Sequence, residues 1–515
     1  MRLALFVIAA IASSAAAQER LTLDEAIARG LEKNADIVIE RESLAIADAA
    51  LLRANAAYEP ALRGDFRYRD RTDPVNSILS GAPEGEVAPQ TRSLQSSASL
   101  VRLIPTGASI SFFSALNRDQ TDSVLALLTP SWSTLLGAEI RQPLMQNRRI
   151  DPARRAIRIA RADRSRADSS LRRIASEIVA AIERSYWNVT AARRGVSIRE
   201  SNLRVAGQQR DDTRIRVQGG VQPEADLSQT DAEVERRRGD LLTSRENLLR
   251  AENALRSLIA RDADDPIWTR EIATDDVTAS ADRAPVDLAS AIAQALAQRP
   301  ELEELQHRLE RQDVEIAAAL DRVRPQLDLL ASYNGRGLAG NENDDAISPF
   351  GRPVTVPDAI DGGLERSLGT IGENRFPDAT IGVSFTIPLG NTAAKQDVAI
   401  ARAIRRQSEA TLAQARQRVA YEVRNAAAAL DTARQRIEAA EAGRKAAEIQ
   451  LQAERDRLTA GASTTFFILT RQNDLAAAQL AEVVARTDYR KADTELARAT
   501  GSLLEARGIE VRGSR

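Results

Sequence analysis

The pattern of apolar and polar positions changes from a helical to a strand period at Pro60. Residues 22–58 predict a helix, because Thr22 is a favoured N-cap and Glu25, three positions later, completes a capping box. Proline lacks the N–H that a helix interior needs, so Pro60 ends this helix. A helix therefore leads directly into an extended segment.

After Pro60, apolar and charged side chains alternate with the period of a β-strand. One face carries Leu62, Gly64, Phe66 and Tyr68, and the other carries Arg63, Asp65, Arg67 and Arg69. Four ionic side chains cannot lie in a dry core, so the charged face needs water and the opposite face needs lipid or protein. This alternation is typical of a barrel strand around a water-filled lumen.

The same period returns in three more segments, residues 136–141, 327–334 and 381–386, so four strands are predicted. The segments 72–90 and 335–377 are rich in Gly, Pro, Asn and Asp, and we expect extracellular loops there. Residues 93–117 contain a possible additional hairpin about Pro105-Thr106-Gly107. Its strands could lengthen the barrel wall or lie outside it.

Two very long helical hairpins are predicted downstream of the strands. Each has a helix of nearly 70 residues, which would reach about 100 Å. Glycines mark the turns, Gly219-Gly220 in the first hairpin and Gly461 in the second. The expected helix pairs are 151–217 with 223–259, and 392–458 with 464–502. Apolar spacings of three, four and seven indicate coiled-coil packing.

These elements occur twice in the same order, which indicates a tandem duplication. Leu288, Pro325, Pro388 and Gly461 repeat Leu23, Pro60, Pro143 and Gly220. The predicted organisation is a first repeat at 18–261, a linker at 262–286, a second repeat at 287–505 and a flexible tail at 506–515.

The N-terminus has the order of a secretory signal peptide. Met1-Arg2 is followed by an apolar stretch to Ile11 and by Ala15-Ala16-Ala17, so residues 1–17 are expected to be removed. The chain has no cysteine, which excludes disulfides and a thioether-linked lipid anchor. No later stretch approaches the roughly 20 apolar residues of a membrane-spanning helix.

Composition gives little support to an enzyme or a nucleic-acid-binding protein. Lys plus Arg (71) nearly balances Asp plus Glu (73), so no polyanionic partner such as nucleic acid is indicated. The single histidine, His307, has the pattern of a surface residue, and no phosphate loop, metal-spaced cluster or nucleophile motif is found. We therefore expect no catalytic residues, no metal site and no cofactor.

The segment 148–173 is rich in arginine. Its position after a predicted strand allows contact with lipid headgroups. A solvated or ion-paired helix face is the alternative interpretation.

Together these features resemble the TolC-like outer membrane efflux proteins. The phrases Leu21-Thr-Leu-Asp-Glu-Ala26 and Ile140-Arg-Gln-Pro-Leu144 are similar to phrases of that family. The resemblance implies an α+β membrane protein and a homotrimer. Each chain would supply four strands to a twelve-stranded transmembrane β-barrel, and the coiled-coil hairpins would form a periplasmic α-barrel. The implied partners are outer membrane lipid, a periplasmic adaptor (membrane fusion) protein and an inner-membrane transporter.

The resemblance also indicates where a periplasmic aperture would lie. The family commonly carries aspartates in the helix after the tip glycine, and Asp226 matches such a position. The second repeat has Phe467 and Thr470 there instead. Phe466 and Phe467 could form an apolar plug, or they could only pack between neighbouring helices. The tip glycines Gly219, Gly220 and Gly461 would contact the adaptor.

Two functions of different classes fit the sequence. The first is a passive exit duct in the outer membrane, serving efflux or type I secretion. Two methionines, one histidine and no cysteine argue against a metal-liganding lumen. The alternative is a periplasmic coiled-coil scaffold or adaptor without a pore. The duplicated alternating strands favour the duct.

Overall fold

The computed structural model describes residues 19–72, 74, 81–270, 272–274, 286–347 and 355–511. The expected signal peptide and parts of the expected loops and linker lie outside these residues. Within them the chain forms two compact units. One unit consists of the chain up to Ile46, Ser165–His307 and Glu409–Arg515, and the other consists of Ala47–Arg164 and Arg308–Ser408.

The helices of the two predicted repeats have nearly equal lengths. The first repeat has α1 (Leu23–Lys33), α2 (Ala35–Asn55), α3 (Pro152–Gln218) and α4 (Glu224–Ile259). The second has α5 (Leu288–Gln298), α6 (Pro300–Arg322), α8 (Thr392–Thr459) and α9 (Thr465–Thr500). Helices α3 and α8 have 67 and 68 residues, and α4 and α9 have 36 each. Both predicted helical hairpins are therefore present.

Corresponding caps begin the first helix of each repeat. Thr22 accepts a hydrogen bond from the Glu25 N–H and donates its own N–H to the Glu25 carboxylate, which is the predicted capping box. Asp287 accepts hydrogen bonds from the N–H groups of Ala289 and Ser290. Both caps satisfy N–H groups that the first helical turn leaves without a partner.

Ion pairs join the helices within each long hairpin. Arg199 of α3 contacts Asp240 of α4 at 3.1 Å, and Arg486 of α9 contacts Glu441 of α8 at 2.6 Å. Among the described residues, no helix is both long enough and apolar enough to span a membrane.

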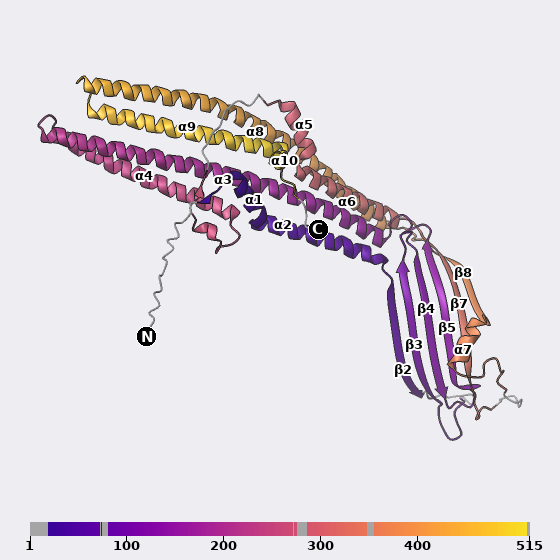
Figure 1. Ribbon diagram of the computed structural model, residues 1–515. Helices are drawn as coiled ribbons and strands as arrows, with labels where there is room; N and C mark the ends of the chain where they lie inside the picture. The colour runs from indigo at the N-terminus through magenta and orange to yellow at the C-terminus, as the bar shows by residue number, and fades with distance from the viewer. Residues whose placement is uncertain are drawn as a thin grey trace, which may run out of the picture. The chain divides into compact units, whose positions relative to one another are not determined.

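One antiparallel sheet contains six strands. They are β2 (Ala61–Thr72), β3 (Gln90–Leu103), β4 (Ser109–Thr121), β5 (Leu128–Pro143), β7 (Gln326–Glu342) and β8 (Phe376–Thr386). Neighbours follow the order β2-β3-β4-β5-β7-β8, with β2 at one edge and β8 at the other (Figure 1). All four predicted strands form. Four strands per chain is nevertheless wrong, because the possible hairpin at 93–117 lies inside the sheet as β3 and β4.

The second repeat has a helix where the first has this hairpin. Helix α7 (Leu364–Gly372) falls between β7 and β8, in a segment that the sequence predicted as loop. Its short length and its Gly and Thr content hide it from a helical pattern search.

Part of the predicted linker is packed. The short strands β1 (Glu19–Arg20) and β6 (Ile272–Ala273) pair in parallel, and a 3-10 helix occupies Pro266–Trp268. Ile267 and Ile272 are buried in the core of the first unit, with Tyr186, Leu255 and Ile259 among its members. The linker segment before residue 274 therefore contributes to the core.

The beginning of the predicted flexible tail is also packed. Leu503, in the short helix α10 (Leu503–Ala506), is buried in the same core, and Ile509 and Val511 pack against it. The Arg507 guanidinium donates two hydrogen bonds to the fully buried Glu183 carboxylate, at 2.8 and 2.9 Å. Residues 507–511 are held by these contacts, contrary to the expectation of a free tail.

Candidate channel surfaces

The sheet has one apolar face that is largely exposed. Strand register places most of the large apolar side chains of the six strands on this face. They include Leu62, Phe66, Tyr68, Leu100, Phe112, Leu136, Ile140, Leu329, Tyr333, Ile381, Val383 and Phe385, all exposed. Ile381 is 83% exposed and Phe385 70%. A contiguous apolar patch of this kind marks a surface that contacts lipid or another protein.

The opposite face of the sheet is mostly polar, and it also carries Phe113, Leu135, Leu330, Leu338 and Phe376. Its side chains include Arg63, Asp65, Arg67, Gln95, Ser97, Ser99, Asn117, Asp119, Ser133, Glu139, Arg141, Asp328, Ser332, Arg336, Asp378 and Thr380. Charges pair across neighbouring strands, as in Arg336–Asp378 at 3.0 Å and Arg141–Asp328 at 3.3 Å. A hollow of about 700 Å³ includes Asp65, Gln95 and Asn117 in its lining. This face is suited to water, as the alternation predicted.

Helix α7 covers part of the apolar face. Its Ser367 and Thr370 are buried, and the Ser367 hydroxyl lies 2.8 Å from the Thr134 hydroxyl of β5. Gly335 and Gly337 of β7 leave the room that the helix needs, because a Cβ at Gly337 would lie 2.1 Å from the Ser367 carbonyl oxygen. Leu368 points away and is 53% exposed. The helix thus buries polar side chains and exposes an apolar one.

The two hairpin tips have the same backbone geometry. Gly220 and Gly461 adopt left-handed conformations, with φ of 72° and 74°. The N–H of Val221 donates to the Arg216 carbonyl, and the N–H of Ala462 donates to the Arg457 carbonyl, each at 2.9 Å. This is the helix ending that favours glycine. Gly219, Gly220 and Gly461 are all exposed, as a contact site requires.

The predicted aperture residues lie on different hairpins. Asp226 is partly exposed in the first turn of α4, and Phe467 takes the equivalent place in α9. Phe466 and Phe467 are about half exposed and form an edge-to-face pair with ring centres 5.6 Å apart. The Thr470 hydroxyl donates to the Phe466 carbonyl at 3.0 Å. The structure brings Phe467 and Thr470 together on one helix, with Asp226 at the other tip.

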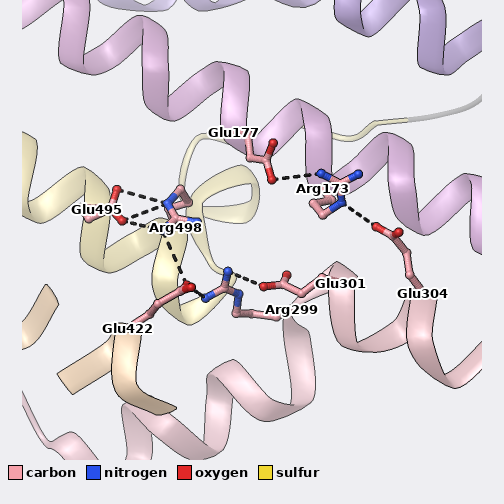
Figure 2. Close-up of polar contacts among 8 residues, drawn as sticks. All are labelled: Arg173, Glu177, Arg299, Glu301, Glu304, Glu422, Glu495 and Arg498. Carbon is pink, nitrogen blue, oxygen red and sulfur yellow. Dashed lines mark hydrogen bonds and ion pairs between the residues drawn. The ribbon is translucent and has the colours of Figure 1, made fainter. Parts of the chain in front are cut away.

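A charged cluster that the sequence did not predict joins three helices of the first unit (Figure 2). The Arg299 guanidinium, between α5 and α6, is almost fully buried and contacts Glu301 and the α8 residue Glu422. Arg498 of α9 contacts Glu422 at 3.8 Å and Glu495 more closely. The hydrogen bonds that Arg498 donates to the Glu495 carboxylate raise the pKa of Arg498 above its ordinary value, although burial opposes them. This cluster ties α6, α8 and α9 to one another.

Beside this cluster, Arg173 of α3 pairs with Glu304 of α6 at 2.8 Å and with Glu177 at 3.1 Å (Figure 2). Burial would lower the pKa of Arg173, but both carboxylates outweigh it and the pKa lies above its ordinary value. Burial raises the pKa of Glu304, and Arg173 opposes only part of that rise. For the neighbouring charged cluster, the sequence offered one signal, which is that Arg299 stands next to Pro300 between two helices. That signal does not indicate which carboxylates Arg299 contacts.

The arginine-rich segment is largely ion paired. Its described pairs are Arg154–Asp151, Arg155–Glu315, Arg164–Asp48, Arg172–Glu303 and Arg173–Glu304. These contacts favour the paired helix face over a lipid headgroup site for the five arginines. Across the described ranges, no group of three or more His, Asp or Glu side chains is placed to hold a metal ion.

A sequence profile described as Outer membrane efflux protein matches residues 115–261 and 291–502. None of the curated proteins matches the sequence.

Solved structures of outer-membrane channels are similar in fold. The Campylobacter jejuni CmeC outer membrane channel has 15% identity and a TM-score of 0.64, covering 93% of this chain and 86% of that one. The Vibrio cholerae outer membrane protein VceC has 15% identity and a TM-score of 0.62, covering 93% and 96%. The open state of the Neisseria gonorrhoeae MtrE outer membrane channel has 16% identity and a TM-score of 0.59, covering 93% and 89%.

The profile match extends over more than half of the chain and includes both helical hairpins. The chain therefore belongs to the outer membrane efflux protein family and is a protein of the outer membrane.

Proposed function

We propose that this protein is the homotrimeric exit channel of a tripartite efflux or type I secretion system. The observation that carries the proposal is the two-faced sheet, whose apolar side chains are exposed on every strand while the other face is charged. Such a sheet separates lipid from water when it closes on itself. The channel is passive, and an inner-membrane transporter supplies the energy for export.

The hairpin tips are the proposed contact site for a periplasmic adaptor protein. Gly219, Gly220 and Gly461 are exposed, and no side chain at these positions hinders close approach of another backbone. The left-handed glycines also give both tips one shape, so one kind of adaptor surface can recognise both.

The proposed periplasmic aperture is lined by Asp226, Phe467 and Thr470. Phe466 and Phe467 expose about half of their surface in a chain with few aromatic residues, which supports an apolar plug at the second tip. Closing three copies around one axis would bring the three Phe467 rings together. Thr470 bonds to its own helix and would contribute little polarity.

The first experiment is fractionation followed by native mass measurement in detergent. Recovery from the outer membrane at three chain masses supports the channel. A detergent-free periplasmic monomer or dimer would overturn it and favour the coiled-coil scaffold.

Single-channel conductance then tests the plug. Phe467→Ala should raise conductance, whereas Val484→Ala, farther along the same helix, should leave it unchanged. Equal conductance of both variants and the wild type would exclude the plug.

A further inference from the structure

We propose that three copies of this chain close a ring of eighteen strands, not twelve, because the β3–β4 hairpin belongs to the wall. This inference rests on the trimer of the proposed function. It concerns the width of the passage, which the family resemblance alone would underestimate.

The hairpin cannot leave the sheet without separating β2 from the rest. Strand β3 pairs with β2 from Thr72↔Gln90 to Ala61↔Val101, along the whole of β2. Strand β4 pairs with β5 from Ser109↔Arg141 to Asp119↔Ser131. If β3 and β4 were outside the wall, β2 would lose all the backbone hydrogen bonds that it makes to a neighbouring strand in this sheet.

The two hairpin strands continue both faces of the sheet. Leu100 and Phe112 face each other on the apolar side, and Ser97 and Ala115 face each other on the polar side. On the apolar face the Arg118 guanidinium lies 5.5 Å from the centre of the Trp132 ring of β5. An apolar band that ends at an aromatic residue is the pattern of a membrane-spanning wall.

The hairpin turn is fixed to the end of β5 and to a residue that follows it. Gly107 has φ of 89°, and its N–H donates to the Ile104 carbonyl at 2.9 Å. The Thr106 hydroxyl donates to the Gln142 side chain at 3.2 Å. A Cβ at Gly107 would lie 2.7 Å from the Asn147 carbonyl oxygen, so the turn packs closely there. These contacts hold the hairpin in line with its neighbours.

The edges of the six-stranded sheet fit a second copy of the same chain. Strand β2 has 12 residues and β8 has 11, and in the described part of the chain each pairs with one neighbour only. Unpaired strand edges bind further strands through their free N–H and C=O groups. Six is an even number, so β8 of one copy and β2 of the next run antiparallel with their apolar faces on the same side.

The extra strands widen the passage. Barrel diameter grows roughly linearly with strand number, so eighteen strands give a ring about 1.5 times as wide as twelve. The added inner surface is mostly polar, with Gln95, Ser97 and Asn117 among its side chains, and its large apolar members include Val101 and Phe113. The strand-lined end of this channel therefore accommodates bulkier hydrophilic solutes than a twelve-stranded ring of the same fold.

Electron cryomicroscopy of the detergent-extracted full chain tests the count directly. Eighteen strands in a three-copy particle support the inference. Twelve strands in a three-copy particle, with residues 90–121 outside the wall, would overturn it and leave the proposed channel intact. A particle that is not trimeric would instead contradict the proposed function.

A hairpin deletion gives a matched comparison. Removing residues 90–126 brings β2 beside β5, and Arg67 then faces Ser133, both on the polar face. The register is preserved, so the ring should close with about two-thirds of its diameter. Polymers added on the extracellular side should be excluded from the channel at a smaller polymer size than in the wild type. An unchanged cutoff in a folded trimer would contradict the inference.

Cysteine labelling keeps the test decisive if the deletion variant does not fold. The chain has no cysteine, so each introduced thiol is the only one. In outer membranes, a water-soluble maleimide should label Ser99→Cys and the β2 reference Arg63→Cys. It should spare Leu100→Cys and the β2 reference Leu62→Cys. Equal labelling of Leu100→Cys and Ser99→Cys would place the hairpin outside the wall.

Discussion

The two repeats share four helices of similar length and differ in the region of the sheet. Helices α4 and α9 have the same length, and the tip glycines adopt nearly the same φ. Between the outer strands of each repeat, however, the first has the β3–β4 hairpin and the second has helix α7. The helical hairpins thus keep their lengths in both repeats, whereas the sheet contains two added strands without a change in the direction of the other strands or in the face that their side chains occupy.

Parity explains why the sheet tolerates this difference. One added strand would reverse the direction of every later strand, but a hairpin restores it. The period-two pattern also keeps the apolar side chains on one face, provided that the register is preserved. Two strands are therefore the smallest insertion that leaves the rest of the wall as it was.

The junction between the first two helices of each repeat differs in chemistry. Asn34 ends α1 and donates to the Leu258 carbonyl at 3.0 Å. At the corresponding place Arg299 ends α5 and contacts Glu301 and Glu422. Both residues are buried, with 6% of their surface exposed. A neutral amide and an ionic cluster thus occupy equivalent positions.

The largest expected effect comes from Arg299→Ala. Removing one partner of a buried ion pair costs about 3 kcal/mol, because Glu422 and Glu301 lose the cation that offsets their desolvation. Asn34→Ala should cost about 1 kcal/mol, since it removes neutral hydrogen bonds. Thermal unfolding in detergent measures both variants. Equal losses would show that the two junctions contribute alike.

Substitution of Gly337 should break the contact that is particular to the second repeat. An alanine Cβ would lie 2.1 Å from the Ser367 carbonyl oxygen and 2.2 Å from the Thr134 hydroxyl. We expect Gly337→Ala to cost about 2 kcal/mol and to release α7 from β7. Protease cleavage within residues 355–375 should then increase.

Gly382→Ala is the matched control, because nothing lies within 4 Å of a Cβ at that position of β8. Unchanged cleavage in the Gly337 variant would mean that α7 does not depend on this close approach.

The tip glycines should respond alike. Gly220→Ala and Gly461→Ala place a Cβ on a left-handed residue, which costs about 1 kcal/mol each. Neither site has an atom within 4 Å of the new Cβ, so strain is the only cause. Denaturant unfolding should give losses within a few tenths of a kcal/mol of one another. A loss at one tip alone would show that their environments differ.

The smallest expected effect is on the pH dependence of stability, which should change in opposite directions when Asp265 and Glu304 are substituted. Hydrogen bonds from the N–H groups of Ile267 and Arg261 lower the pKa of Asp265, with burial opposing. The Asp265 carboxylate therefore stabilises the folded protein at pH values above its pKa in the unfolded chain. This stabilisation is lost as the pH falls through its pKa in the folded protein. Burial raises the pKa of Glu304. The protonated form of Glu304 therefore stabilises the folded protein at pH values below its pKa in the unfolded chain, and this stabilisation is lost as the pH rises through its pKa in the folded protein.

As pH rises from about 3 to 7, Asp265→Asn should lose stability relative to the wild type and Glu304→Gln should gain it. Thermal unfolding across this range measures both differences. Changes of the same sign in the two variants would contradict the assignment of causes.

Local signals in the sequence were sufficient for the elements. The capping box at Thr22 and the glycines at the tips act over one helical turn, and the alternation after Pro60 acts along one strand. Such signals depend on neighbours in the chain, so the two long helical hairpins, their tips and four of the strands were predicted correctly. The single helix expected at 22–58 is instead divided at Asn34 into α1 and α2. The equivalent positions of Asp226 and Phe467 also follow from sequence spacing.

The tertiary structure alone decided what depends on distant residues. The place of β3 and β4 in the wall is set by pairing with β2 and β5, and alternation by itself does not choose partners. Helix α7 forms where Gly335 and Gly337 make room on another strand. Arg299 meets Glu422, which is far from it in the chain, because three helices pack together. The sequence by itself determined the faces and turns, and packing determined the number of strands and the charged partners.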